Sequence, residues 1–260
     1  MTTALITGAS MGIGETFARE LAAKNTDLVL VARSQDKLQD LATELTNKYQ
    51  IETTVIAQDL TEPGAIQNVF DKITAQGSTI DMLINNAGFG DYGAFGDRPL
   101  SKMLAMVQLN ISALVELTGL FLPQMQQRKA GSIVNVASIA AFQPIPYMSV
   151  YAASKAFVLS FSEALWSENK DLGVKVIAVC PGPTESKFYD RAEFPESATG
   201  LNGMTMASSE KVVQDSLKAL DKGQSNAVVG GFANQIIVNL PRLMPRDLLV
   251  ETVGKQFKKM

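Results

Sequence analysis

The stretch TALITGASMGIG, residues 3–14, decides the fold of this chain. Its first five residues are mostly apolar, as in a buried strand, and they run directly into the glycine-rich segment 8–14. A helical pattern follows at once, with Ile13, Phe17 and Leu21 spaced three or four residues apart. The free backbone N–H groups and the dipole at the start of such a helix attract an anion, and glycine lets the ligand approach closely. The sequence therefore predicts a phosphate-binding turn.

The segment Gly8–Gly12 also matches GxSxG, the turn that carries the nucleophile of α/β-hydrolases. That alternative needs a base for Ser10, and the chain contains no histidine. The same absence excludes Ser-His-Asp and Cys-His hydrolases, HExxH metalloproteases and three-histidine zinc sites. A single cysteine, Cys180, excludes an internal disulfide and a cysteine-rich metal site, so we expect no metal. A purely structural glycine-rich turn is the alternative that remains open at this point.

Short apolar segments typical of buried parallel strands alternate with helical patterns along the chain. Repeated β-α-β units with short connections predict an α/β fold. We expect one domain over residues 1–260, a Rossmann-like doubly wound parallel sheet of about seven strands with helices on both faces. The predicted strands are 3–7, 27–32, 53–57, 80–84, 132–137, 174–179 and 226–230. The predicted helices are 13–25, 34–48, 62–76, 100–128, 149–170 and 208–222.

Two segments interrupt this alternation. Residues 183–207 form an irregular stretch with several aromatic side chains, long for a structureless connection, so we expect a substrate lid there. Residues 232–260 contain five Lys or Arg and two Asp or Glu, so this C-terminal extension is basic. We expect terminal helices packed on the sheet or on another subunit. Peripheral contact with a membrane surface is the alternative.

Charge and the first residues bear on partners and location. The chain has a net charge of -3 and a pI near 5.2, which argues against a nucleic-acid-binding protein. Its start, MTTALITGAS, lacks the basic and apolar regions of a signal peptide. We found no run of 18 apolar residues, so we expect no transmembrane segment and a cytoplasmic location.

The end of the second predicted strand bears on cofactor choice. In dinucleotide-binding folds an acidic residue at this point binds the ribose hydroxyls, whereas a cation accommodates a 2′-phosphate. Here Arg33 and Ser34 follow the strand, so the sequence favours NADP(H) over NAD(H). A solvated arginine at a helix start is the alternative. Ser10 and Ser34 either meet a phosphate or cap the helices that they precede.

Tyr151 and Lys155 are four residues apart in a helical pattern, so they lie on one helix face. A free tyrosine has a pKa of about 10, too high for acid–base exchange at neutral pH. An ammonium group one turn away stabilises the phenolate and lowers that pKa. The pair therefore suits proton transfer, although Tyr-x-x-x-Lys also arises by chance.

Other motifs along the chain make a functional role for this pair more specific. In chain order these are TGASMGIG at 7–14, Asp59, NNAG at 85–88, Asn110, Ser138, YAASK at 151–155 and Pro181-Gly182. In this combination the chain resembles the short-chain dehydrogenases/reductases over about residues 3–230.

The resemblance implies four catalytic residues. Tyr151 is the general acid in carbonyl reduction and the base in alcohol oxidation. Lys155 lowers the pKa of that tyrosine and hydrogen-bonds the nicotinamide ribose. Ser138 orients and polarises the substrate oxygen. Asn110 holds a helix kink and a water that links the lysine to solvent.

It also implies cofactor-binding positions at the strand ends. These are Gly8, Gly12, Ile13 and Gly14 at the pyrophosphate, Asp59 and Leu60 at the adenine, Asn85, Ala87 and Gly88 toward the adenosine ribose, and Pro181, Gly182 and Thr184 at the nicotinamide carboxamide. The sequence departs from the family pattern twice. Met11 stands where many NADP-preferring relatives have Lys or Arg, and Ser186 stands where Thr is usual, so Thr184 and Ser186 are alternatives for the carboxamide.

These inferences predict an oxidoreductase that transfers hydride between NADP(H) and a carbonyl or secondary alcohol. The apolar 183–207 lid favours a lipophilic or acyl ketone over a sugar. A non-catalytic NADP(H)-sensing or scaffolding protein on the same fold is the alternative. The helices at 100–128 and 149–170 resemble those that pair subunits in the family, so we expect a homodimer or homotetramer.

Overall fold

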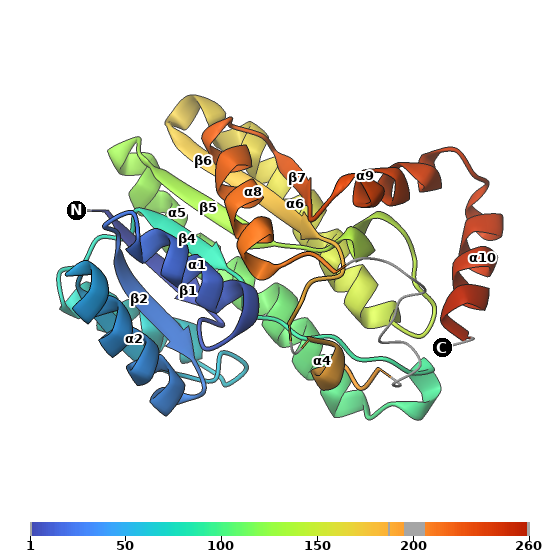
Figure 1. The fold of residues 1–260 in the computed structure, drawn as a ribbon, viewed down its shortest axis with the longest axis horizontal. Coiled ribbons are helices and arrows are strands. Elements are labelled where there is room, and N and C mark those ends of the chain that lie inside the picture. The colour runs from blue at the N-terminus through green and yellow to red at the C-terminus, as the bar shows by residue number, and fades with distance from the viewer. Residues whose placement is uncertain (1, 187, 195–205, 259–260) are drawn as a thin grey trace.

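The computed structural model describes residues 2–186, 188–194 and 206–258. Within these residues, one parallel sheet of seven strands has the order β3-β2-β1-β4-β5-β6-β7 (Figure 1). The predicted Rossmann-like sheet is therefore confirmed. The strands are β1 (Thr3–Thr7), β2 (Asp27–Ala32), β3 (Thr53–Ala57), β4 (Met82–Asn85), β5 (Gly131–Val136), β6 (Val174–Pro181) and β7 (Asn226–Val229).

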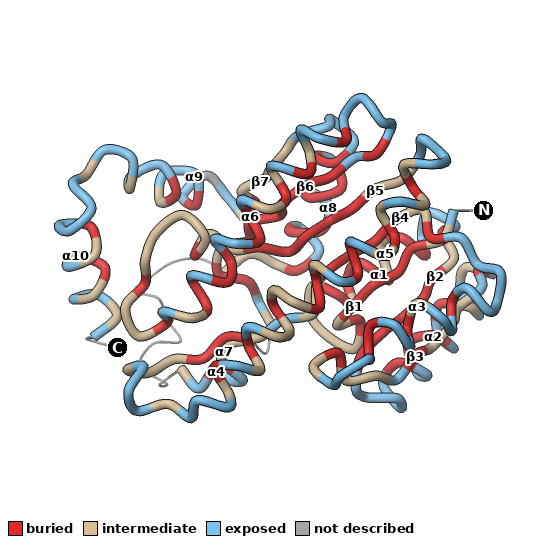
Figure 2. The backbone as a smooth tube through the Cα atoms, turned by 180° about the vertical axis from the view of Figure 1, so that it is seen from behind, coloured by how far each residue is buried: buried red, intermediate tan, exposed pale blue. Residues whose placement is uncertain are grey.

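Both faces of this sheet are apolar, because helices cover both. In β1, Ala4 and Ile6 face one core layer and Leu5 faces the other. Such strands bury side chains in both directions, as parallel strands between helical layers do (red in Figure 2). One layer contains α1 (Gly12–Ala22), α2 (Gln35–Tyr49) and α8 (Ser209–Asp221). The other contains α3 (Ala65–Ala75), α5 (Ala113–Arg128) and α6 (Ser149–Asn169).

The helix predicted at 100–128 is interrupted. It consists of α4 (Leu100–Val107), a π-helical segment η2 (Gln108–Ser112) and α5. At the centre of the π segment, the buried Asn110 side chain accepts a hydrogen bond from the Phe89 backbone N–H and donates one to the Phe89 carbonyl. Single π turns within α-helices often mark functional sites. The expected kink at Asn110 therefore takes the form of a π turn.

By length and composition alone, Leu100–Arg128 is apolar enough to cross a membrane, with a mean hydropathy of 1.5 over its best window. The second half of this stretch packs against the sheet through Ala113, Leu117, Phe121 and Met125, which are buried in one core layer. Helices of a protein core have the same composition. Packing thus accounts for the apolar character of the α5 half, whereas Leu100 and Leu104 on α4 are exposed.

The C-terminal extension predicted at 232–260 forms α9 (Phe232–Asn239) and α10 (Arg246–Lys258), which extend beyond the edge of the sheet (red in Figure 1). The side chains of Leu249 and Val253 on α10 pack with Ile145 and Met148, from the connection between β5 and α6. The expected packing of this helix on the sheet is therefore wrong for α10. Residues 259–260 lie outside the described residues.

The predicted lid at 183–207 is described in part, because residues 187 and 195–205 lie outside the described residues. Its described part contains α7 (Phe188–Arg191). Short 3-10 turns complete the elements: η1 (Phe95–Asp97), η3 (Ile139–Phe142), η4 (Lys170–Leu172) and η7 (Leu240–Arg242).

Buried polar side chains tie the centre of the sheet to its helices. The Asn85 side-chain amide donates hydrogen bonds to the hydroxyl of Thr118 on α5 and to the side-chain oxygen of Asn135 on β5, at 3.1 and 2.9 Å. The Asn135 amide in turn donates to the hydroxyl of Ser162 on α6, at 2.9 Å. All four side chains are buried, so water does not replace a lost partner at low cost.

This network predicts a large stability effect at its centre. We expect Asn135→Leu to lower the free energy of unfolding by about 2–4 kcal/mol, because Asn85 and Ser162 both lose a buried partner. The matched control is Asn239→Leu, at an exposed asparagine, with an expected change within about 0.5 kcal/mol. Urea unfolding measures both values. Equal losses in the two variants would contradict the role of the network.

Candidate active site

A cavity of about 790 Å³ opens at the carboxyl ends of the strands, where ligands bind in open α/β sheets. Most of the positions singled out in the sequence line it. They are Gly8, Ser10, Met11, Gly12, Ile13, Arg33, Ser34, Asp59, Leu60, Ala87, Gly88, Ser138, Tyr151, Lys155, Pro181, Gly182, Thr184 and Ser186. Three other predicted positions, Gly14, Asn85 and Asn110, are not part of its lining.

The glycine turn has the form of an anion site. Helix α1 starts after Met11, which provides no side-chain cap, so the capping role suggested for Ser10 is wrong. Ser34 likewise makes no capping hydrogen bond to α2, although it is the N-cap residue. An uncapped helix start leaves N–H groups for a ligand, and here the start borders the cavity. These features fit the pyrophosphate of a dinucleotide.

Gly14 acts by packing and not by lining the cavity. A Cβ atom at this position would lie 2.4 Å from the Gly8 carbonyl oxygen and 2.4 Å from the Asn86 side-chain nitrogen. Only glycine therefore lets the first turn of α1 sit so close to the ends of β1 and β4. The residue shapes the phosphate turn from behind.

Arg33 and Asp59 lie together at the tips of β2 and β3. Their guanidinium and carboxylate groups are 3.7 Å apart, and the Arg33 side chain is 69% exposed. Burial opposes ionisation of Asp59, but hydrogen bonds from Thr61 and the charge of Arg33 outweigh it and lower its pKa. The arginine is thus a largely exposed cation on the cavity wall, accessible to a second anionic group.

The two asparagines after β4 have different roles. The Asn85 side chain points between the sheet and α5, where it bonds to Thr118 and Asn135. We expected it to face the cofactor, and this expectation is wrong because the side chain does not line the cavity. The physical reason is the alternation of side chains along a strand. Asn86 lines the cavity instead, and its amide donates to the Thr7 carbonyl at 2.9 Å. Asn86 therefore ties the ends of β1 and β4 together.

Tyr151 and Lys155 project from the first turns of α6, and both are buried, at 8% and 6% exposure. The Lys155 ammonium donates a hydrogen bond to the Val136 carbonyl at the end of β5, at 2.8 Å. It lies 5.8 Å from the centre of the Tyr151 ring. Ser138 follows the same strand and lines the same cavity. The structure therefore brings these three predicted residues together.

Burial controls the protonation of this group. It raises the pKa of Tyr151 to about 12, and the neighbouring Ser138 hydroxyl only partly opposes the rise. Burial also lowers the pKa of Lys155 to about 8. The expected lowering of the tyrosine pKa is therefore not found in the protein alone, because desolvation outweighs the hydrogen bond with Ser138. The Lys155 ammonium group bonds to the Val136 carbonyl instead.

Asn110 supports the catalytic helix from outside the cavity. Its side-chain amide donates to the Ser154 hydroxyl at 3.0 Å, and that hydroxyl donates to the Tyr151 carbonyl at 2.7 Å. Ser154 is thus a hydrogen-bonding link and not merely a small residue between helices. Through this link, the π turn fixes the helical turn that carries the tyrosine.

The end of β6 forms the next part of the wall. The Thr184 hydroxyl donates to the Gly182 carbonyl at 2.9 Å, so this hydroxyl already has a partner. The Ser186 hydroxyl accepts a long hydrogen bond from the Phe188 N–H, at 3.4 Å. Ser186 also lies opposite the turn, since a Cβ atom on Gly12 would be 3.5 Å from the Ser186 Cβ. The two hydroxyls remain alternatives for a carboxamide partner.

The remaining wall is mostly apolar, apart from residues such as Lys102 and Arg191, and comes from segments that carried no sequence motif. Phe188 and Tyr189 of α7 line it, and the Phe188 ring lies 5.2 Å from the Tyr151 ring. On α10, apolar residues recur every four positions at Leu249, Val253 and Phe257, and all three line the cavity. That helical spacing was the available signal for this wall, but it did not indicate which surface the helix would cover.

Known proteins resemble this chain in sequence and in fold. The family model described as short chain dehydrogenase matches residues 2–194. This chain belongs to the short-chain dehydrogenase family. Its family is that of dehydrogenases, and the comparisons give no support to the non-catalytic alternative.

Three individual proteins show what this short-chain dehydrogenase resembles. It is 39% identical over 186 residues to a very-long-chain 3-oxoacyl-CoA reductase of Anas platyrhynchos, covering 68% of the chain and 58% of that protein. The chain thus spans about three-fifths of the relative's length. A short-chain dehydrogenase from Sphingobium yanoikuyae in complex with NADPH has a TM-score of 0.82 and 33% identity, covering 88% and 87% of the two chains. A 7beta-hydroxysteroid dehydrogenase has a TM-score of 0.87 and 26% identity, covering 97% and 96%.

The buried lysine predicts a conflict between stability and activity in this short-chain dehydrogenase. Because the pKa of Lys155 is lowered to about 8, the folded protein resists protonation that the unfolded chain accepts up to about pH 10.5. Stability therefore rises with pH between these values. We expect Lys155→Met to raise the free energy of unfolding by about 1–3 kcal/mol at pH 7, with the gain shrinking toward pH 10.

Denaturant unfolding at pH 7 and pH 9.5 measures this gain, and turnover should be lost in the same variant. The control is Lys218→Met, at an exposed lysine on α8, which should change stability little at either pH. A gain in Lys155→Met that does not depend on pH would show that packing, and not the buried charge, produces it.

Proposed function

We propose that this short-chain dehydrogenase uses NADPH to reduce the ketone of a lipophilic or acyl substrate, with 3-oxoacyl thioesters as the leading class. One observation carries the proposal. A single cavity is lined both by the phosphate turn with Arg33 and by the apolar side chains of α7 and α10, and Tyr151 and Ser138 line it too. Cofactor, reacting carbonyl and an apolar substrate body can therefore share one space.

The name of the Anas platyrhynchos relative supports an acyl substrate, because that protein is called a very-long-chain 3-oxoacyl-CoA reductase. The NADPH complex of the Sphingobium relative supports the choice of cofactor. Arg33 adds a local reason, since it is an exposed cation at the point where a 2′-phosphate is accommodated. Met11 provides no second cation in the turn, so the preference rests on Arg33.

The protein's own residues supply the proton and the alignment. When bound, the nicotinamide cofactor supplies the hydride. Tyr151 holds a proton on its phenol oxygen and donates it to the carbonyl oxygen of the substrate. Ser138 accompanies it in the wall and orients that oxygen. Lys155 and Arg33 would hold the cofactor through its ribose and its 2′-phosphate.

Protonation favours the reductive direction at neutral pH. A tyrosine whose pKa is about 12 keeps its proton and is ready to act as an acid. Alcohol oxidation needs the phenolate instead. The reduction rate should therefore vary little between pH 6 and 8, and the oxidation rate should rise with pH over the same range.

We also propose that the chain forms a homo-oligomer through α4 and α6. Leu100 and Leu104 on α4 are exposed at 63% and 59%, and Phe157 on α6 at 39%. The two helices contact each other, and exposed apolar side chains on neighbouring helices are typical of a surface that another protein covers. The two helices are those expected to pair subunits.

Replacing Tyr151 by Phe tests the catalytic proposal. We expect turnover to fall by about 10²–10⁴-fold because the proton donor is lost, while NADPH affinity changes less than about twofold. Tyr189→Phe removes another hydroxyl from the same cavity and should keep most of the activity. NADPH consumption measures turnover against 3-oxoacyl thioesters, bulky ketones, keto esters and sugars. A preference for sugars would overturn the proposed substrate class.

Replacing Arg33 by Ala tests the choice of cofactor. A charged hydrogen bond to a phosphate contributes about 1.5–3 kcal/mol, so kcat/KM for NADPH should fall roughly 10- to 100-fold. The value for NADH should hardly change. Lys48→Ala removes a cation from the far end of α2 and should leave both values as they are. If Arg33→Ala retains the wild-type ratio between the cofactors, Arg33 does not select NADPH.

A further inference from the structure

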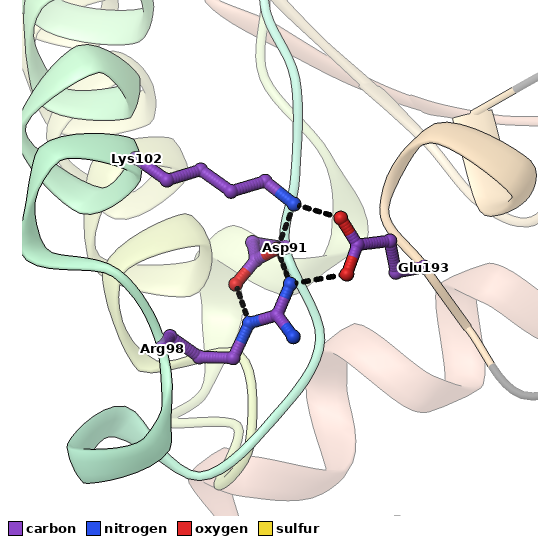
Figure 3. Close-up of polar contacts among 4 residues, drawn as sticks. All are labelled: Asp91, Arg98, Lys102 and Glu193. Atoms are coloured by element: carbon purple, nitrogen blue, oxygen red, sulfur yellow. Dashed lines mark hydrogen bonds and ion pairs between the residues drawn. The ribbon is translucent and has the colours of Figure 1, made fainter.

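Four charged side chains join the described part of the lid to the body of the protein (Figure 3). Asp91 lies in the loop after β4, Arg98 precedes α4 and Lys102 lies on it, and Glu193 follows α7. The Glu193 carboxylate is 2.6 Å from the Arg98 guanidinium and 2.5 Å from the Lys102 ammonium, one oxygen to each cation. The two negative charges of the carboxylates thus balance the two positive charges of Arg98 and Lys102 within one cluster.

The half of the cluster on the body is fixed without Glu193. Asp91 is buried, and its two oxygens accept hydrogen bonds of 2.6 Å from two nitrogens of Arg98. Lys102 is 2.5 Å from the same carboxylate. The stem of Arg98 also packs on Gly93, where a Cβ atom would lie 2.5 Å from the Arg98 Cδ. The Asp91 side chain is only 1% exposed and bonds to both cations, so it fixes the positions of the Arg98 and Lys102 head groups.

Glu193 occupies a position that its backbone does not favour. Its φ of 57° is in the left-handed region, where it ends the short helix α7. Glycine adopts this conformation without steric cost, whereas other residues pay roughly 1 kcal/mol. A glutamate here makes the local turn less stable than a glycine would. Both of its carboxylate oxygens are taken by the two cations.

Residues 188–194, the segment that ends in Glu193 and Phe194, form the wall over Tyr151. The Tyr92 N–H donates to the Ala192 carbonyl at 2.9 Å, and the rings of Tyr92 and Phe194 lie 5.0 Å apart. At the start of the segment, Phe188 packs on the Tyr151 ring and on Gly90, where a Cβ atom would be 2.6 Å from the Phe188 ring. Residues 188–194 therefore lie against residues 90–92 along their length.

We propose that Glu193 is a positioning residue, whose carboxylate on Arg98 and Lys102 holds the aromatic wall of residues 188–194 in place beside Tyr151 and so sets the affinity for the ketone substrate. This role rests on the proposed function. Glu193 itself is absent from the cavity lining, whereas Lys102, Phe188 and Phe194 line it. The residue acts on the substrate through the wall.

Ionic strength, and not physiological pH, should control this contact. The hydrogen bonds from Lys102 and Arg98 lower the pKa of Glu193 to about 2, so the carboxylate stays ionised above pH 4. Burial opposes the ionisation of Asp91, but the same two cations keep its pKa below the usual range. The Glu193 side chain is 55% exposed, so salt can screen its interaction with the cations.

The experiment compares steady-state kinetics of the wild type, Glu193→Gln and Glu193→Gly with a bulky ketone or 3-oxoacyl thioester. We expect both substitutions to raise KM for that substrate about 3- to 10-fold, with kcat and the KM for NADPH changed less than about twofold. Between 0.05 and 0.5 M salt, the wild-type KM should rise by a similar factor, because the Debye length falls from about 14 to 4 Å. The KM of Glu193→Gln should stay flat. Glu193→Asp, which keeps the charge, should recover part of the affinity.

Glu193→Gly separates the carboxylate from the backbone, because glycine relieves the left-handed turn and still removes the charge. Its control is Lys129→Gly, at another left-handed residue, which ends α5. That variant should gain the same backbone relief and keep the wild-type KM. If Glu193→Gly binds the ketone as well as the wild type does, the carboxylate has no positioning role.

A readout independent of turnover separates this inference from the proposed function. Amide hydrogen exchange of residues 188–194, where the Ala192 and Phe194 N–H groups are hydrogen-bonded, should be several-fold faster in Glu193→Gln. Unchanged exchange would overturn the positioning role even in an active enzyme. A wild type inactive on every ketone would refute the proposed function, whereas faster exchange in the variant would still support the contact.

Discussion

The reversal of strand order beside β1 is the constraint on which the rest of the structure depends. Because β2 lies on one side of β1 and β4 on the other, the connections after these strands diverge and leave a crevice at their carboxyl ends. The glycine turn after β1 and the Asn86 side chain after β4 meet across this crevice. Several later elements add walls to the same space, among them the π turn through Leu109, then α7 and α10.

The order of elements and the cofactor half of the cavity were predictable from sequence because both depend on local patterns. Buried strands, helix periodicity and the turn at Gly8–Gly14 are each encoded within a few residues. Orientation was harder to predict. Asn85 and Asn86 are neighbours of one residue type, and the register of β4 against β1 and β5 decides which of them faces the cavity.

Burial depth was the other quantity that the sequence could not provide. A helix that places Tyr151 and Lys155 on one face predicts their proximity, but their pKa values depend on what covers them. Here desolvation dominates both groups, and the lysine bonds to the Val136 carbonyl. From this burial we expect the Lys155 ammonium group to weaken the fold at neutral pH. Short-chain dehydrogenase chemistry gives that ammonium a use, which is the usual balance between stability and an active site.

The substrate half of the cavity differs in kind from the cofactor half. Its walls come from the loop after β4, from α7 and from α10, which are far apart in sequence and meet only in the folded chain. Such contacts leave no contiguous motif, and α10 has only its four-residue apolar spacing as a signal. Contacts between segments therefore have to hold this half together. The Tyr92 hydroxyl donates to the Phe257 carbonyl on α10, at 2.7 Å. Residues 188–194 are held by the hydrogen bond from the Tyr92 N–H to the Ala192 carbonyl and by the ion pairs of Glu193. A binding wall fastened at a few such points can change its shape without disturbing the sheet, so substrate range can vary while the hydride-transfer site stays constant.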